Sequence, residues 1–572
     1  MFPSPSVWQA SNPTQSALLV DLSTALIAHA WFRKYEPGSV ESGLIRLAVF
    51  ATAPVVTTFR TLPSPLVNVP LHLAIFISIL LCSIVLYRLS PFHPLAKYPG
   101  PIFCKISKFW FAWIAHEGKT HLYFDELHKK YGPIVRIGKQ FRLMPHKRDI
   151  HALVQVPTNC PQGMPKGPMW EGRYFAPGKK QRSGYSLISA RDFTSHAKLR
   201  KPWNRAFGST ALKDYEEALI ARGTQLVEIL KGTIRDSQDG VGHADISKCI
   251  SNWSFDFMGD AIFGENFDLM ATNDKDGLVQ ALDDAHWFPT ISQMVPWAWE
   301  FFTLFPAFTR SSGKFSKFAF QQAQKRGTKV TEKRDLFYHL AANMDIDDDK
   351  PPLPLIISNA ILAMVAGSHT TSLVISSIMY HLLLHPEYLV RLQKELDTAF
   401  PPSEQSVIQL DKLANLELLE AIINEDLRLQ PPVPTYLQRA PSPGSGGRLL
   451  KDIFIPEGTA VVVPPYAMHR DPRNFSPDPE RFWPERWYTQ SDRIILDRAA
   501  FIPFSHGPAN CVGRPLAMQE MRYITSMLVY NFDFSLEDGY NLKQWGEDLA
   551  DRFILIKGNL PVKVKRRNVA RV

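Results

Sequence analysis

The sequence predicts a mainly α-helical protein with a minor β part, preceded by an N-terminal transmembrane region. Three observations predict this class. The run 69–87 is apolar and carries no Asp, Glu, Lys or Arg, helical periodicity recurs through the rest of the chain, and strand-like stretches are short. The 45 prolines exceed the usual proportion, so many turns and irregular connections are expected rather than a coiled coil.

The first 90 residues are expected to form the membrane region. The run 69–87 just spans a hydrocarbon core of about 30 Å. Two weaker candidate spans, 17–32 and 44–59, contain the charged residues Asp21 and Arg46. A charge at the centre of a span costs about 2.5–3.5 kcal/mol on insertion scales, so the alternative is that these two segments are interfacial or loosely packed helices.

The charges after the strongest span predict its orientation. Arg88, Lys97, Lys105 and Lys108 follow it, and positive flanks stay on the cytosolic side. The proline-rich stretch 91–110 is expected to be a stiff hinge, because proline resists helix formation. The catalytic domain is then 111–572, facing the cytosol.

Helical periodicity and proline positions predict the elements of the domain after residue 120. Helices are expected over 123–131, 211–234, 251–263, 354–384, 388–400, 416–429 and 516–532. A turn leading into a strand is expected over 131–138. Prolines and aromatic residues crowd 458–487, where no long element is expected.

Composition excludes several classes of protein. Hydrophobic residues make up 45% and charged residues 21%, which excludes a mainly disordered chain. The net charge of +9 is too diffuse to indicate nucleic-acid binding. Five cysteines are too few for a disulfide scaffold and form no C-x-x-C zinc pair. They are Cys82, Cys104, Cys160, Cys249 and Cys511.

Cys511 is the cysteine placed for chemistry. Gly507 and Pro508 precede it, and Gly513 and a helical run follow, so its sulfur lies near a helix N-terminus. Backbone N–H groups and the helix dipole there favour a thiolate. A thiolate can be a metal ligand or, with a base such as His506, a nucleophile. A third alternative is a buried, inert cysteine.

Several separate stretches together resemble one family, the cytochromes P-450, which are haem-thiolate monooxygenases. They are the cysteine loop with Phe504, Gly507, Cys511 and Gly513; the E-x-x-R pair Glu425 and Arg428; PERW with Arg486; AGSHTT at 366–371; HAKLR at 196–200; and PGP at 99–101. The resemblance covers about 95–565, and the arrangement is similar to that of microsomal fungal-type members. It implies the cytochrome P-450 fold.

The resemblance also implies a role for each matched residue. Cys511 would be the axial ligand of the iron of heme b, with Phe504, Gly507 and Gly513 around its sulfur. Three cationic residues, His196, Arg200 and Arg439, would contact the haem propionates. Glu425, Arg428 and Arg486 would form a structural network that locks the cysteine loop. Gly367, His369 and Thr370 would lie on the side where dioxygen binds.

Two positions depart from the pattern of the family. His369 stands where the family usually has Asp or Glu; an imidazole can relay a proton as well. Ala509 stands where a basic residue usually pairs with a propionate. Gly367, in the middle of a helix, indicates close approach by a bulky group such as the flat macrocycle. The Thr370 hydroxyl would assist dioxygen activation, or it simply bonds back to a carbonyl one turn earlier.

The resemblance implies partners and a location. A separate NADPH-cytochrome P-450 reductase would supply electrons, with cytochrome b5 as a second candidate donor, and the site would be the endoplasmic reticulum membrane. The expected reaction is oxidation of a hydrophobic small molecule, for example in terpenoid or other secondary metabolism. The alternatives are a haem-thiolate isomerase or dehydratase that does not use dioxygen, and a non-catalytic membrane haem protein.

Five dispersed, mostly apolar stretches are expected to contact the substrate. They are 164–175, 294–305, 363–368, 433–437 and 552–555. The aromatic stretch 297–308 either dips into lipid or packs in the core.

Overall fold

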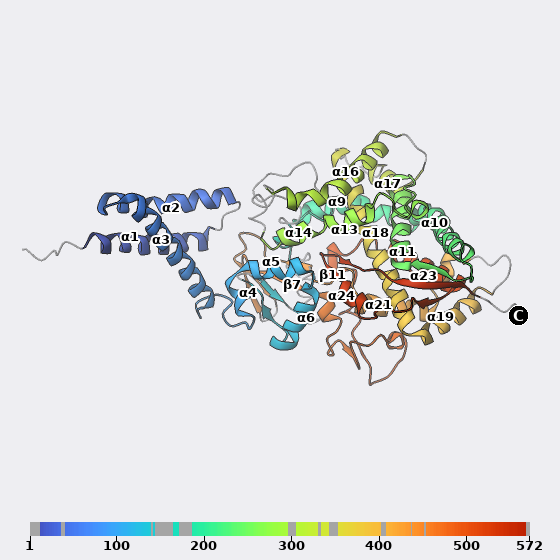
Figure 1. Cartoon of the computed structure of the whole chain (residues 1–572). Coiled ribbons are helices and arrows are strands. Elements are labelled where there is room, and N and C mark those ends of the chain that lie inside the picture. Colours follow the sequence, from blue (N-terminus) through green and yellow to red (C-terminus); the bar gives the residue numbers. More distant parts are fainter. Residues whose placement is uncertain are drawn as a thin grey trace, which may run out of the picture.

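A bundle of three N-terminal helices projects from a larger α-rich body (Figure 1). The computed structural model describes residues 12–35, 40–138, 141–143, 164–170, 186–295, 305–329, 333–342, 353–401, 408–435, 437–450 and 453–567. Cys160, residues 171–175 of the predicted stretch 164–175, and most of the stretches 294–305 and 297–308 lie outside the described residues.

The bundle consists of α1 (Pro13–Lys34), α2 (Val40–Thr61) and α3 (Pro65–Leu89). By length and composition, two of its segments, Glu41–Thr61 and Pro65–Leu89, are apolar enough to cross a membrane. In the predicted transmembrane region, α2 and α3 therefore have the length and the apolar composition of membrane-spanning helices. A third helix of the described chain passes the same criterion, α18 (Leu353–Leu384), but it lies mostly buried inside the body.

The body is organised around α18. This helix of 32 residues is apolar on most of its circumference, so it needs partners on nearly every side. The longest contact is with α11 (Ile246–Phe263), which runs along it. Asp245 caps the start of α11 by accepting hydrogen bonds from the backbone N–H groups of Ser247 and Lys248, and this fixes where the helix begins.

The other helices surround this pair (Figure 1). They are α4 (Ile102–Ile106), α5 (Lys108–Glu117), α6 (Thr120–Tyr131), α9 (Phe193–Ala206), α10 (Ser209–Arg235), α12 (Leu269–Thr272), α13 (Leu278–Ala285), α14 (Trp287–Ser292), α16 (Pro306–Thr328), α17 (Leu336–Ala342), α19 (Pro386–Ala399), α20 (Leu410–Leu413), α21 (Glu417–Leu429), α22 (Pro465–Met468), α23 (Arg514–Asn531) and α24 (Gln544–Asp548).

The β part is small and divided among several sheets. A four-stranded sheet has the order β1-β2-β7-β4, with β2 and β7 parallel, and a three-stranded antiparallel sheet has the order β10-β13-β3. The strands are β1 (Val135–Arg136), β2 (Phe141–Leu143), β3 (Gly242–Asp245), β4 (Leu437–Arg439), β5 (Gly447–Leu450), β6 (Ile453–Pro456), β7 (Ala460–Val463), β8 (Phe475–Ser476), β9 (Ile495–Leu496), β10 (Phe532–Leu536), β11 (Ala550–Asp551), β12 (Leu555–Ile556) and β13 (Pro561–Arg566). The predicted class, mainly α with a minor β part, is confirmed.

The predicted helices are all present, with ends shifted by a few residues. The shift is largest for α11, which begins at Ile246 rather than at 251 because Asp245 supplies the cap. The stretch 458–487 indeed holds only short elements, including the 3-10 helix η2 (Pro484–Trp487). The sequence did not reveal α16, whose polar and aromatic residues follow no clear apolar period.

The hinge is more structured than the prolines suggested. We expected 91–110 to resist helix formation, but α4 lies inside this range and α5 begins in it. The prolines are confined to the turns before α4. There the chain packs tightly on the body, because Arg136 N–H donates to Pro99 O at 2.7 Å and a Cβ added to Gly100 would lie 2.1 Å from Arg136 O.

Candidate functional site

The cysteine loop joins the 3-10 helix η3 (Gly507–Ala509) to α23. Cys511 N–H donates to Phe504 O at 2.8 Å, which folds the loop back on itself. Gly507 has φ +77°, a left-handed conformation that favours glycine. The sulfur therefore stands at the entry of α23, as the loop sequence predicted.

Two opposing effects act on the Cys511 thiol. Crowding by protein atoms raises its pKa, whereas the backbone N–H groups of Gly513 and Arg514 and the nearby charge of Arg200 lower it. The side chain nevertheless remains exposed, so the sulfur lies in a recess that a ligand can enter. Backbone N–H groups aimed at the sulfur are the contacts that tune a metal-bound thiolate.

A buried ion network stands next to this loop. Glu425 on α21 takes a bidentate contact from Arg428, with both N–O distances 2.9 Å, and accepts from Arg486 Nε at 3.0 Å. All three side chains are fully buried. Burial alone would raise the pKa of Glu425, but the two guanidinium groups hold it below its ordinary value. The three residues predicted to form a network are thus in contact.

Backbone carbonyls accept further hydrogen bonds from the two guanidinium groups. The network holds two guanidinium groups and one carboxylate, so one positive charge is in excess. Arg428 also donates to the carbonyls of His469 and Arg481, and Arg486 donates to those of Pro477 and Asp478. Because these carbonyls belong to the irregular stretch before the cysteine loop, the network shapes that stretch.

Two residues of the network were missed by sequence reasoning. Trp487, where the family has Phe, donates from its indole Nε1 to Glu425 Oε2 at 3.0 Å. His469 is buried and accepts at Nε2 from the Ile502 backbone N–H at 3.0 Å, while its Nδ1 lies 3.2 Å from Arg428 O. His469 therefore connects the network to the chain that enters the cysteine loop. The Trp-for-Phe exchange was the signal for Trp487; the sequence held none for His469.

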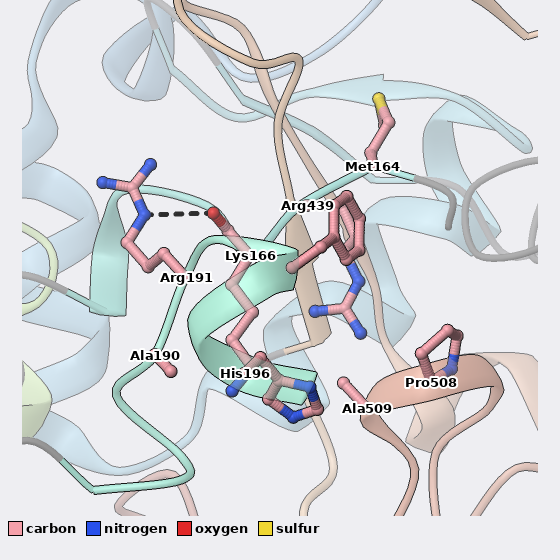
Figure 2. A pocket seen from close by; sticks show the side chains of 9 residues that line it. Met164, Lys166, Ala190, Arg191, His196, Arg439, Pro508 and Ala509 are labelled. Atoms are coloured by element: carbon pink, nitrogen blue, oxygen red, sulfur yellow. Dashed lines mark hydrogen bonds between the residues drawn. The ribbon is translucent and has the colours of Figure 1, made fainter. Parts of the chain in front are cut away.

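A small cavity beside the loop is lined by cations (Figure 2). Lys166, His196 and Arg439 point into the space next to Ala509. Lys166 reaches it because its backbone forms an isolated β-bridge with Arg439 of β4. The ammonium group of Lys166 donates to the carbonyls of Leu187 and Ile188, which uses two of its three donors.

The cations of this cavity repel one another. Burial, followed by the charges of Arg439 and Arg200, lowers the pKa of Lys166 to about 7. Burial, followed by the charges of Lys166, Arg200 and Arg439, lowers the pKa of His196 to about 4, and burial lowers that of Arg439 to about 10. Among the residues described here, the cavity lining contains no carboxylate. Such a set of buried basic side chains favours an anionic group of a ligand, whose charge would stabilise their protonated forms.

Arg200 bonds the cysteine loop. Its guanidinium group donates to Asn510 O at 2.6 Å and to Asn510 Oδ1 at 2.8 Å. It therefore braces the residue next to Cys511 instead of lining the cation cavity. Lys166, which sequence reasoning missed, stands in the cavity together with His196 and Arg439.

Gly367 lies against α11. A Cβ added to it would lie 2.3 Å from Met258 Cε, so the close approach that the structure shows at Gly367 is that of α11. Ser254 Oγ on α11 donates to the neighbouring Ser368 O at 3.0 Å, which holds the two helices together at this point.

Another strip of α18 is accessible. Between residues 355 and 384, all of which are described, only Ala366 is exposed. One turn later Thr370 is partly accessible, and its hydroxyl donates to Ala366 O at 2.6 Å. The back-bond weighed as an alternative is therefore present; it leaves the oxygen of Thr370 able to accept a hydrogen bond.

His369 faces a second cavity, of about 170 Å³, on another side of α18. Its Nε2 lies 2.6 Å from Asp283 Oδ1 on α13. Lys557 also lines this cavity and donates to the hydroxyls of Ser251 and Ser372. Burial lowers the pKa of Lys557 to about 8. The cavity is polar and has room for several water molecules.

Four of the five predicted substrate stretches meet in one apolar cluster. It contains Met169 and Trp170, Met294, Val433, and Phe553 and Ile554. Trp170 and Phe553 contact edge to face, with ring centroids 5.4 Å apart. The fifth stretch, 363–368, lies in α18 and joins the main core. The residues expected to bind an apolar molecule are thus gathered by the fold.

The residues present fit the haem that the resemblance implies. A recessed sulfur with two backbone N–H groups suits an iron ligand. The buried cations beside it suit propionates, and the open strip of Ala366 and Thr370 suits a flat ring with a small ligand above it.

Comparison with known proteins agrees with this geometry. The cytochrome P-450 family model matches residues 98–559. Tryprostatin B 6-hydroxylase of Aspergillus fumigatus is 30% identical over 507 residues, which cover 88% of this chain and 86% of that protein. The cytochrome P-450 monooxygenase aba2 of Botryotinia fuckeliana is 31% identical over 84% of this chain and 91% of its own.

The indole of Trp487 gives a testable prediction. Trp487→Phe removes one hydrogen bond to a buried carboxylate and should lower the free energy of unfolding by about 1.5 kcal/mol, measured by urea unfolding in detergent. Trp483→Phe is the matched control and should cost less, because Trp483 uses its backbone N–H to bond Glu425. Equal losses in the two variants would show that the indole hydrogen bond contributes nothing.

Proposed function

The chain belongs to the cytochrome P-450 family and is a monooxygenase of that family, and we propose that it oxidises a hydrophobic small molecule with dioxygen and electrons from NADPH. The observation that carries this proposal is the recess at Cys511, where a thiol with two backbone N–H donors lies beside a cavity lined by buried cations. When bound, a thiolate-ligated haem supplies the activation of dioxygen.

In this proposal the group is heme b and each part of the site has one task. Cys511 holds the iron, and Phe504, Gly507 and Gly513 shape the loop around its sulfur. Lys166, His196 and Arg439 neutralise the propionates, so that Lys166 takes the place of the basic residue missing at Ala509. Arg200 keeps Asn510 in position. The network of Glu425, Arg428 and Arg486 holds the loop.

A separate reductase is proposed as the electron source. The sequence contains no G-x-G-x-x-G unit for a nicotinamide or flavin nucleotide. An NADPH-cytochrome P-450 reductase in the same membrane is the partner that fits, with cytochrome b5 as a further donor. The apolar N-terminal helices and the basic residues after them support a place in the endoplasmic reticulum membrane with the body in the cytosol.

The substrate is proposed to be a hydrophobic metabolite. Support comes from the apolar cluster around Trp170 and Phe553, which offers aromatic surface and few charges. The names of the relatives point the same way, since one of them hydroxylates tryprostatin B. A role in secondary metabolism follows from these names and not from any single residue.

Proton supply is proposed to run through the polar cavity behind α18. Reduction of dioxygen consumes protons. Thr370, in the middle of α18, has a partly accessible hydroxyl group. His369 is adjacent to Thr370 in sequence and lines the polar cavity. It can therefore pass protons from that cavity toward Thr370. Asp283 orients the imidazole of His369 through the bond to Nε2. The family usually has a carboxylate at position 369 of α18, whereas here the nearby carboxylate belongs to α13.

The first prediction tests the ligand. Cys511→Ser should leave the protein in the membrane fraction but abolish the carbon monoxide difference spectrum typical of a thiolate-ligated haem. Wild-type protein mixed with a reductase should consume NADPH and oxidise apolar substrates. Survival of the thiolate spectrum in Cys511→Ser would mean that another residue binds the iron.

The second prediction tests Lys166. Lys166→Leu should speed haem transfer to an apo-acceptor protein about ten- to hundredfold, which corresponds to loss of one hydrogen bond between charged groups. Adding Ala509→Arg to this variant should restore retention, because it returns a cation to the family position. Lys198→Leu, on the exposed side of α9, is the control. If Lys166→Leu retains haem like the wild type, the lysine does not contact the propionates.

The third prediction tests the proton route. Asp283→Asn and His369→Ala should both raise the peroxide released per NADPH consumed, Thr370→Ala should raise it more, and His369→Asp should keep it low. Asp284→Asn is the control, because its carboxylate is exposed and bonds only Gln280 among the described residues. Wild-type peroxide release in Asp283→Asn and His369→Ala would assign both residues to helix packing alone.

A further inference from the structure

We propose that all three N-terminal helices span the membrane, and that the bond between Asp21 and His72 is the lock that allows α1 to insert. By composition alone, α1 is not among the membrane-spanning candidates of the described chain. It has 22 residues, which at 1.5 Å per residue is long enough to cross the hydrocarbon core. The polar residues of α1 are the feature that disfavours its insertion into a membrane.

Two polar side chains of α1, Asp21 and His29, are paired with side chains of α3. Asp21 is fully buried and its Oδ2 lies 2.6 Å from His72 Nδ1. Two turns further along α1, His29 Nδ1 lies 2.5 Å from Ser83 Oγ. Between these pairs a small apolar core is formed by Ala25, Ala28, Phe76 and Leu80. Both polar pairs advance in the same direction, so α1 and α3 run parallel.

The outer surface of the bundle is apolar on all three helices. Its exposed side chains are Leu18, Leu19, Leu22, Leu26 and Ile27 on α1; Leu44, Ile45, Val49, Val56 and Phe59 on α2; and Leu66, Val67, Leu71, Ile77, Leu81 and Leu86 on α3. A surface this apolar is costly in water. Lipid hydrocarbon is the occupant that fits it, because the large side chains on the outside are apolar and the Asp21 carboxylate is paired with His72 inside the bundle.

Basic residues mark one end of the bundle. Arg33 and Lys34 end α1 and Arg88 ends α3, while Arg46 near the start of α2 donates to Tyr35 O. The guanidinium of Arg33 lies 4.8 Å from the ring centroid of Tyr87, which brings these termini together. At the other end, Arg60 is the one basic side chain among the described bundle residues. The positive-inside rule then puts the basic end in the cytosol.

The catalytic body is attached at this same basic end. Arg88 donates to Ile106 O, and its own carbonyl accepts from Arg136 of β1 at 3.0 Å. The hinge and α5, which follow α3 in the chain, also carry exposed apolar residues. They are Phe92, Ile102, Phe103, Phe109, Trp110 and Trp113. The chain before α1 and the turn between α2 and α3 therefore lie across the membrane from the body.

Glycosylation mapping distinguishes the topologies. A glycosylation acceptor on a Gly/Ser-rich spacer is inserted before Asn12, within 36–39, or within 62–64, in full-length protein expressed in eukaryotic microsomes. Three spans require modification at the first and third positions and none at the second. Modification at all three positions would mean that α3 spans alone, and modification at the third alone would leave α1 on the cytosolic face; either pattern overturns the proposal.

The lock is tested in the protein with the acceptor before Asn12. His72→Leu leaves the carboxyl group of Asp21 without a partner in lipid, so α1 should stay out and most molecules should lose modification. Asp21→Leu with His72→Leu should restore it. His29→Leu is the control, since the Ser83 hydroxyl can bond back to its own helix. Unchanged modification in His72→Leu, or no recovery in the double variant, would show that the pair is not the lock.

Discussion

The structure of the site depends on one buried carboxylate, that of Glu425. Two guanidinium groups, one indole and one backbone N–H converge on it. Removing one partner of such a network leaves an unpaired buried charge, at a cost of about 3–5 kcal/mol. Because the same guanidinium groups also bond the carbonyls of the stretch before Cys511, the cysteine loop can hold its shape without regular secondary structure.

The two cavities carry different arrangements of charged side chains, so they suit different ligands. The cavity beside Ala509 is lined by basic side chains whose pKa values are lowered by burial and then by mutual repulsion, so it suits an anionic ligand group. The cavity behind α18 pairs His369 with Asp283 and holds Lys557 against hydroxyl groups, so it suits water and protons. Helix α18 separates this second cavity from the accessible strip of Ala366 and Thr370.

Membrane attachment follows the same physical rule as the catalytic site. Asp21 in α1 is tolerated for the same reason as Glu425 in α21: each buried carboxylate has a hydrogen-bonded partner from another helix. The bond between Arg136 and Arg88 joins the anchor to β1, so the angle of the body to the bundle is held by hydrogen bonds as well as by prolines.

Motifs and periodicity determined much of the description of this protein: the helix-rich class, the apolar span ending near residue 87, the cysteine loop, and the partners Glu425, Arg428 and Arg486. These features are local or belong to a family pattern, so the order of residues reveals them. Lys166, His469 and Asp283 could not be found in this way, because each acts on residues far from it in the chain. The reason that Gly367 is glycine and the pairing that buries Asp21 were likewise decided only by the tertiary structure, since close packing and the burial of charge depend on which helices become neighbours.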